Sequence, residues 1–192
     1  MKFFIYPLFA ISFALAPLQS IEARKYESAH IIPLSRFRGH TYVILGLTKK
    51  GELDDFGGFR NSGETDPKVT AAREAEEETL GVLGSKTTLR KRLTGPIYVV
   101  DMNRGHPHYI LPARDYGPIV SKFNKRRYGK TKLSPCQKEM VELMAIRIEK
   151  VREGVKYYNG RILKLKGPNG KLYPVRRGTS GSLIRAVKKG YL

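Results

Sequence analysis

Acidic side chains are concentrated in one short stretch of an otherwise basic chain. Nine of the 17 Asp and Glu residues lie between Glu52 and Glu78. Three of them, Glu74, Glu77 and Glu78, are spaced so that a helix would bring them onto one face. Like charges at this spacing destabilise a bare helix by about 0.2–0.5 kcal/mol per pair, an effect that a bound divalent cation would reverse. The stretch therefore predicts either a solvated helix face or a site for Mg²⁺ or Mn²⁺, ions that prefer carboxylate oxygens.

A helix is predicted over residues 67–80. Asp66 can cap its first turn, a proline suits its first position, and Gly81 can end it. The pair Gly57 and Gly58 comes shortly before, where the missing side chains let the backbone approach a phosphate or a metal closely. A glycine loop that leads into a glutamate-rich helix favours the metal site over the solvated face.

The same segment resembles a known sequence motif. Residues 57–81, GGFRNSGETDPKVTAAREAEEETLG, are similar to the Nudix box, which has a glycine, five residues, a glutamate, seven residues, then Arg-Glu, an apolar residue, any residue, Glu-Glu, any residue and a glycine. Gly58 and Glu64 keep the first spacing, and residues 73–78 keep the second block. The chain departs from the motif by one extra residue after Glu64 and one before Gly81. Neither departure changes the spacing among the three glutamates.

The resemblance implies a metal-dependent hydrolase that cleaves a pyrophosphate bond in a nucleoside diphosphate linked to another moiety. The ligands that it implies for Mg²⁺ or Mn²⁺ are Glu74, Glu77, Glu78 and the carbonyl of Gly58. The residues that it implies for catalysis are Glu78, Glu77, Arg73 and Glu64, of which Glu64 is expected to orient the loop or Arg73. The general base stays open among Glu77, Glu78, Glu139 and Glu142, because a carboxylate from outside the motif could also accept the proton.

The remaining pattern indicates an α/β fold. Short β-branched runs predict strands at 29–34, 41–48, 97–100 and 109–111, and further helices are predicted from Ser134 or Pro135 to Met144 and over 182–189. A hairpin is expected at 161–176 around a Gly-Pro-Asn-Gly turn. Together with the resemblance, these elements predict a Nudix-like α/β/α sandwich with a mixed sheet, plus a basic C-terminal hairpin and helix.

The ends of the chain predict a leader and an extension. Lys2, the apolar run 3–18 and a polar stretch to Ala23 are typical of a signal peptide, so residues 1–23 are expected to direct export to the periplasm or medium. A permanent membrane anchor is the alternative, and after cleavage no spanning segment is expected. Residues 24–154 would then form the hydrolase domain, and residues 155–192 a basic extension packed on it.

A net charge of +19 predicts polyanionic partners. Six basic residues and no acid occupy residues 122–132, which are predicted as a loop, and ten basic residues and no acid follow Glu153. Lys125, Arg126, Arg127 and Tyr128 are the expected substrate-binding residues, since cations and an aromatic ring suit phosphates and a base. A small phosphorylated substrate, in particular a nucleotide, is the expected partner, and no oligomeric state is predicted.

Two other functions stay open at this stage. The basic segments also suit a catalytically inactive Nudix-like module that binds RNA or another polyanion, and the apolar leader suits a membrane-associated enzyme for a lipid-linked diphosphate. His106 and His108 are predicted as surface or strand-end histidines, although a base role for one of them is conceivable. Cys136, the only cysteine, excludes an intrachain disulfide and is expected to be inert.

Overall fold

The computed structural model describes residues 26–192 except 96, 102–104, 114–115 and 130–131. The predicted leader, residues 1–23, lies outside this part of the chain. The strands are β1 (Ser28–Phe37), β2 (His40–Thr48), β3 (Leu53–Asp54), β4 (Phe56–Phe59), β5 (Tyr98–Asp101), β6 (Pro107–Ala113), β7 (Met140–Arg147), β8 (Lys164–Lys166) and β9 (Leu172–Pro174). The helices are α1 (Pro67–Glu78), α2 (Lys86–Arg92), α3 (Tyr116–Gly129), α4 (Ile148–Lys156) and α5 (Arg177–Lys188), with a short 3₁₀ turn, η1 (Cys136–Lys138).

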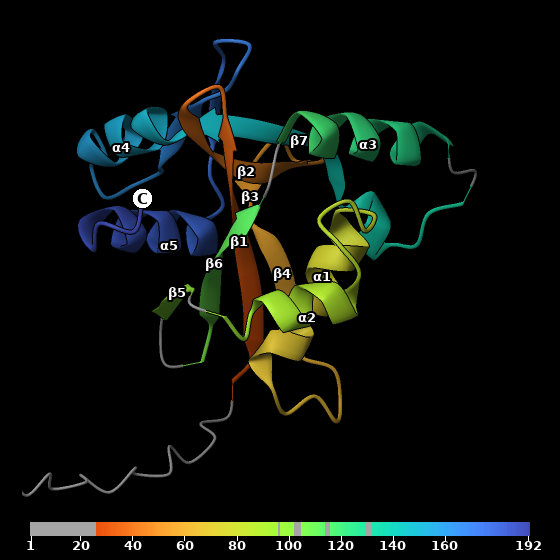
Figure 1. The fold of residues 1–192 in the computed structure, drawn as a ribbon. Coiled ribbons are helices and arrows are strands. Elements are labelled where there is room, and N and C mark those ends of the chain that lie inside the picture. The colour runs from red at the N-terminus through yellow and green to blue at the C-terminus, as the bar shows by residue number, and fades with distance from the viewer. Residues whose placement is uncertain (1–25, 96, 102–104, 114–115, 130–131) are drawn as a thin grey trace, which may run out of the picture.

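Seven of these strands form one mixed sheet in the middle of the molecule (Figure 1). Its main path runs β3-β2-β1-β6-β5, while β4 pairs with β1 and β7 pairs with β2. The β1 and β6 strands are parallel, and the other named pairings are antiparallel. The first half of β1 pairs with β4 and its second half with β2, so that β1 joins the glycine loop to the rest of the sheet.

Helices cover both faces of the sheet. Along β1 the side chains alternate, so that Ile31 enters one hydrophobic cluster and Ile32 the other. The first cluster includes side chains of α1, α2 and α3, and the second includes side chains of α4 and α5. Figure 1 shows α1 and α2 on one side of the strands and α4 and α5 on the other. The α/β/α sandwich with a mixed sheet is therefore confirmed.

The C-terminal residues complete the second hydrophobic cluster. Strands β8 and β9 form the predicted hairpin, and their side chains Leu165 and Tyr173 are buried together with Leu183 of α5. Burial of these side chains stabilises the packing of residues 155–192 on the sheet. Within the described part of the chain, no helix is both long enough and apolar enough to cross a membrane.

The helix predicted from Ser134 or Pro135 to Met144 is wrong. Only the 3₁₀ turn η1 is helical there, and β7 begins at Met140 and pairs with β2 over most of its length. Met, Glu and Leu favour helices when isolated, but this preference is weaker than the burial and pairing that a central strand gains.

Residues 122–129 of the basic segment are helical and do not form the predicted loop. Helix α3 continues to Gly129, and Phe123 within it is fully buried in the first cluster. Burial of this ring holds the helix against the sheet, so its basic residues project from an ordered surface. The short helix α2 and the short strands β3 and β4 were not predicted either.

Candidate active site

Helix α1 begins and ends as its capping residues predict. The Asp66 side chain accepts a hydrogen bond from the Lys68 backbone N–H at 2.9 Å, and Pro67 occupies the first turn. Past the helix, Leu80 and Gly81 both adopt positive φ, at 54° and 70°, and the N–H of Gly81 bonds to the Glu76 carbonyl at 2.7 Å. The extra residue before Gly81 is therefore absorbed in the turn after the helix, and the register of the glutamates is unchanged.

Glu78 is buried at the junction of α1 and β4, the strand in which the structure places Gly57 and Gly58 instead of the predicted loop. Its side chain is 3% exposed, and its Oε2 accepts a hydrogen bond from the Gly57 N–H at 3.0 Å. Burial, followed by the nearby charges of Glu139 and Asp54, raises the pKa of Glu78 well above its ordinary value. A carboxylate held among like charges in this way suits a divalent cation.

Glu74 lies directly against Gly58. A Cβ atom at Gly58 would be 2.6 Å from Glu74 Oε1, so only glycine lets this carboxylate approach the backbone of β4 so closely. Burial raises the pKa of Glu74, and its bond with Arg73 opposes this shift. The glycine pair therefore touches both carboxylates, Gly57 through its N–H and Gly58 through its Cα.

Arg73 ties the loop to the helix. Its Nε and Nη2 donate to the two oxygens of Glu64 at 3.0 and 3.2 Å, and Nη2 also donates to the Phe59 carbonyl at 2.9 Å. Its Nη1 donates to Glu74 at 2.7 Å and lies 3.8 Å from Glu77. A fork of this kind fixes planar carboxylates in place, so Arg73 joins Glu64 and the loop to Glu74 and Glu77 of α1.

The remaining predicted residues lie around this centre. Glu77 is about one-third exposed, and Cys136 of η1 lies beside it. Partial burial and the charges of Glu77 and Glu74 raise the pKa of the Cys136 thiol, which favours its protonated form. Glu139 is exposed, with its Oε1 3.6 Å from Arg176 Nη1.

Two aspartates, Asp54 and Asp55, lie close enough to Glu78 for their charges to act on it. Asp54 accepts bonds from Arg176 and Thr179, and burial together with the charge of Asp55 raises the pKa of Asp54 to about 6. His108 lies near the start of β6, which confirms the predicted strand-end position, and its ring is buried and contacts Asp55. In the sequence, the only sign of these contacts is the pair of adjacent aspartates, Asp54 and Asp55. Their partners become visible only once the pairing of the strands is known.

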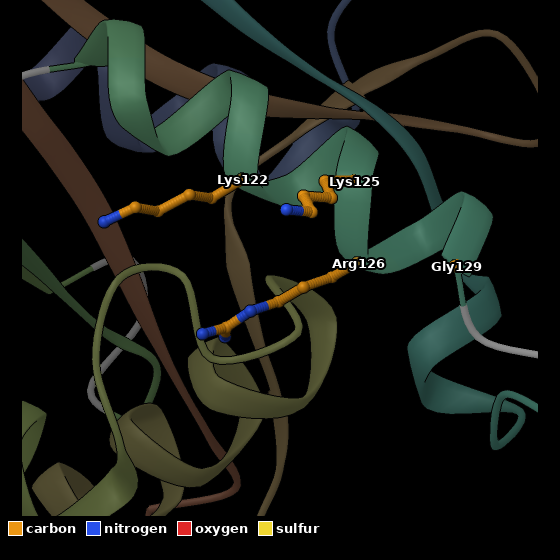
Figure 2. A pocket seen from close by; sticks show the side chains of 4 residues that line it. All are labelled: Lys122, Lys125, Arg126 and Gly129. Carbon is orange, nitrogen blue, oxygen red and sulfur yellow. The ribbon is translucent and has the colours of Figure 1, made fainter.

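The predicted substrate-binding residues divide into two groups. Lys125 and Arg126 line an open pocket of about 350 Å³ together with Lys122 and Gly129. Figure 2 shows the side chains of Lys122, Lys125 and Arg126 extending from α3, with Arg126 reaching the turn that follows α1. There Arg126 Nη1 donates to the Leu80 carbonyl at 2.5 Å.

The other two residues take different positions. Arg127 donates to the Gln137 carbonyl at 3.3 Å, so it contacts the segment around η1. The Tyr128 ring is 83% exposed. The cations that an anionic ligand would meet in the pocket are therefore those of Lys122, Lys125 and Arg126.

Replacing Gly58 with alanine is expected to lower turnover at least about tenfold. The new Cβ would displace the Glu74 carboxylate, since the two would be 2.6 Å apart. Turnover measured at increasing Mg²⁺ concentrations should show that Gly58→Ala needs more Mg²⁺ than the wild type to reach half of its maximal rate. Gly178→Ala is the control, because a Cβ there meets no atom within 4 Å. Equal metal requirements in the two variants would contradict the position assigned to Glu74.

The Glu64 contact predicts a specific acid sensitivity. Burial opposes ionisation, but bonds from Arg73, Thr70 and the Asn61 N–H lower the pKa of Glu64 to about 2. Because the pKa of Glu64 is lower in the folded chain than the unfolded value of 4.5, ionised Glu64 stabilises the fold above pH 4.5. This contribution is lost as the pH falls from about 4.5 through about 2. Urea unfolding of Glu64→Gln at pH 7 should show a loss of at least about 1 kcal/mol relative to the wild type. The difference should shrink toward pH 2, and a difference independent of pH would refute the assignment.

Comparison with known proteins gives matches among solved structures only. No model of a protein family matches the chain, and no curated protein matches it in sequence. An Ap4A hydrolase of C. elegans, in a binary complex, is 12% identical with a TM-score of 0.46, covering 86% of this chain and 97% of that one. The Nudix domain of NrtR from Shewanella oneidensis, complexed with ADP ribose, is 10% identical with a TM-score of 0.46, covering 88% and 89%.

A Nudix hydrolase from Listeria monocytogenes, described as putative, is 14% identical with a TM-score of 0.41, covering 86% of this chain and 97% of that one. At such identities and TM-scores, the ligands and activities belong to those proteins. What this chain does is therefore inferred from its own residues.

Proposed function

We propose that this chain is a Nudix-type hydrolase that uses Mg²⁺ or Mn²⁺ to cleave the pyrophosphate bond of a nucleotide-like or polyphosphorylated substrate. The observation that carries the proposal is the convergence of Glu74 and Glu78 on the glycine pair at residues 57–58. These carboxylates belong to the segment that resembles the Nudix box. Their spacing is the part of the motif that the two one-residue departures leave intact.

The types of donor atom, carboxylate and carbonyl oxygens, suit a hard divalent cation. Glu78 is buried, its Oε2 accepts a hydrogen bond from the Gly57 N–H, and the charges of Glu139 and Asp54 act on it. Bringing such groups together without a cation is costly, and carboxylate and carbonyl oxygens are the ligands that Mg²⁺ takes. We assign the metal ligands to Glu74, Glu77, Glu78 and the Gly58 carbonyl.

Chemistry at this site divides between the ion and the chain. When bound, the ion would neutralise phosphate oxygens and acidify a water molecule for attack on phosphorus. Glu78 is our choice for accepting the proton of that water, because it is buried beside Gly57 and the charges of Glu139, Asp54 and Glu74 act on it. Arg73 and Glu64 hold the loop and Glu74 in register, which makes them positioning residues.

The charged pocket on α3 supports a substrate with several phosphates. Lys122, Lys125 and Arg126 line it, and Arg126 joins α3 to the turn two residues after Glu78. Lysine and arginine clusters attract phosphate groups over distances of about 8 Å at physiological salt. A dinucleoside polyphosphate, a capped RNA or a diphosphoinositol would be bound more strongly by this pocket than a substrate with two phosphates.

The double substitution Lys122→Glu, Lys125→Glu is expected to raise KM for a polyphosphorylated substrate about tenfold, with kcat changed less than about twofold. Its control is Lys164→Glu with Lys188→Glu, which reverses two charges on β8 and α5. Steady-state kinetics at two salt concentrations should show that the difference in KM between the wild type and the α3 variant becomes smaller at the higher salt concentration. An unchanged KM in the α3 variant would remove the pocket from the substrate site.

The substrate class is tested with a panel of phosphoanhydrides in Mg²⁺: a dinucleoside polyphosphate, capped RNA, NADH, ADP-ribose, a nucleotide sugar and a diphosphoinositol. The proposal predicts that polyphosphorylated compounds have the highest kcat/KM. Far better cleavage of ADP-ribose or a nucleotide sugar would refute the polyphosphate preference and leave the hydrolase assignment intact.

The α3 pocket also supports a second candidate, an inactive module that binds RNA or another polyanion. That module would show affinity falling steeply with salt and no metal-dependent hydrolysis.

Export through the N-terminal leader stays part of the proposal, with a membrane anchor as its alternative. A mature N-terminus near Arg24 in a soluble fraction would support export and contradict the anchor.

A further inference from the structure

A histidine and aspartate cluster lies on the face of the sheet opposite Glu74. Asp55 is in contact with two histidines, its Oδ1 3.0 Å from His30 Nδ1 and its Oδ2 2.6 Å from His108 Nδ1. The two imidazole rings are stacked, with centroids 4.3 Å apart and planes 9° from parallel. Both Nδ1 atoms therefore point to the same carboxylate, which is 1% exposed.

The sheet itself assembles this cluster from three separate segments. His30 of β1 and His108 of β6 are direct partners in the parallel register, and Gly57 of β4 is the partner of His30 on its other side. A Cβ at Gly57 would be 2.4 Å from the His30 ring, so the glycine makes room for it. Asp55 lies in the chain between β3 and β4, two residues before this glycine.

A second layer of polar contacts fixes the His30 ring. Its Nε2 is 2.9 Å from Ser28 Oγ, and the same oxygen is 2.8 Å from His106 Nδ1. Histidines that bind metal ions commonly bond through the other ring nitrogen to such a partner, which sets the tautomer and the orientation of the ring. His30 therefore presents Nδ1 to Asp55 with its other nitrogen engaged.

We propose that His30, Asp55 and His108 form a second metal site, for a transition metal ion of the Zn²⁺ type. Their ligand atoms, two imidazole nitrogens and a carboxylate oxygen, all lie within 4.8 Å of one another. Tetrahedral Zn²⁺ bonds of about 2.0–2.2 Å place two ligand atoms roughly 3.3–3.6 Å apart, so ring movements on the order of 1 Å would close the site. A bound ion would take the place of the two hydrogen bonds that join His30 and His108 to Asp55 in its absence.

Ligand chemistry separates this site from the carboxylate site on α1. Imidazole nitrogen favours Zn²⁺ and related transition metals, whereas the glutamates offer oxygen only, which suits Mg²⁺. The charge of Asp54 acts on His30, and the fully buried charge of Asp55 is compensated by the ion. The two aspartates therefore favour a cation at this site, and the two histidines select Zn²⁺ over Mg²⁺.

The site braces the loop that serves the other metal. Gly57 contacts His30 through its Cα and donates its N–H to Glu78. A bound ion would fix His30 and so the position of Gly57, which predicts an effect on stability more than on the chemical step.

The test is Zn²⁺ binding by the chelator-treated full chain in saturating Mg²⁺, measured by calorimetry, with melting temperature as the second readout. The wild type should bind one Zn²⁺ and melt higher with it, and His30→Gln should bind at least about tenfold more weakly. His40→Gln, a histidine of β2 outside the cluster, and Glu78→Gln should bind Zn²⁺ as the wild type does. Equal affinity in His30→Gln, or loss of binding in Glu78→Gln alone, would overturn the proposal.

A measurement on the wild type alone covers the case in which His30→Gln does not fold. With ¹⁵N-labelled histidine, adding Zn²⁺ should shift the imidazole nitrogens of His30 and His108 strongly and leave those of His40 in place. The absence of any shift at His30 and His108 would show that the cluster is only a hydrogen-bonded support of the sheet, and would refute the site.

Discussion

Glu78→Gln is expected to lower kcat for phosphoanhydride hydrolysis by about 100-fold or more while the chain stays folded. The introduced amide would keep the size of the side chain and its bond from the Gly57 N–H. It would remove the negative charge that holds the ion and accepts a proton. Steady-state kinetics with saturating Mg²⁺ measure the loss, and Glu149→Gln on α4 is the matched control on a distant helix.

The same substitution should stabilise the protein when metal is absent. Because burial raises the pKa of Glu78 above 4.5, the folded state prefers the protonated carboxyl, and stability falls as the pH rises from 4.5 toward the raised pKa. Glutamine cannot ionise, so Glu78→Gln should melt above the wild type at pH 8 in a chelator. The gap should narrow below pH 4.5 and on adding Mg²⁺. A lower melting temperature at pH 8 would contradict the crowding of charge around Glu78.

Arg73→Ala is expected to cost about 2–4 kcal/mol of unfolding free energy and to reduce kcat/KM at least tenfold. The Arg73 side chain is 14% exposed and joins Glu64, Glu74 and the Phe59 carbonyl. Its removal leaves two carboxylates without their main cation and frees the loop between β4 and α1.

Arg73→Lys provides the control for charge against geometry. A lysine keeps the positive charge but cannot bridge several acceptors with a planar fork. Urea unfolding should therefore place Arg73→Lys between the wild type and Arg73→Ala. If Arg73→Ala unfolds within about 0.5 kcal/mol of the wild type, the bridge does not hold the loop.

The parts of the site that sequence could predict depend on local spacing. The helix over residues 67–78 follows from the Asp66 cap, Pro67 and the alanines, and the spacing of the glutamates fixes which of them share a face. The contact between Arg73 and Glu64 follows from the resemblance. Their roles in catalysis stay predictions until activity is measured.

The parts that sequence could not predict depend on distant pairing. Strand β7 has the composition of a helix and becomes a strand because β2 offers it a partner. Helix α5 begins at Arg177, five residues before the predicted start, where Thr179 and Ser180 bond to Asp54 and to the Val175 carbonyl. Helix propensity ranks such residues low, and only their tertiary contacts compensate.

Histidine positions illustrate the same limit of local patterns. His30 and His108 are 78 positions apart in the chain, and the parallel pairing of β1 with β6 makes them neighbours. Asp55 reaches both from a third segment. No spacing rule within one segment predicts a cluster of this kind, because the sheet order determines it.

The most direct test of the proposed activity is phosphate release from a polyphosphorylated nucleotide by the wild type, with Mg²⁺ and with a chelator, beside Glu78→Gln. The account predicts turnover by the wild type with Mg²⁺ and a loss of about 100-fold or more both on chelation and in Glu78→Gln. RNA affinity measured on the same samples should not depend on Glu78. Absence of hydrolysis across the phosphoanhydride panel, with salt-sensitive RNA binding equal in both proteins, would contradict the hydrolase and favour the polyanion-binding module.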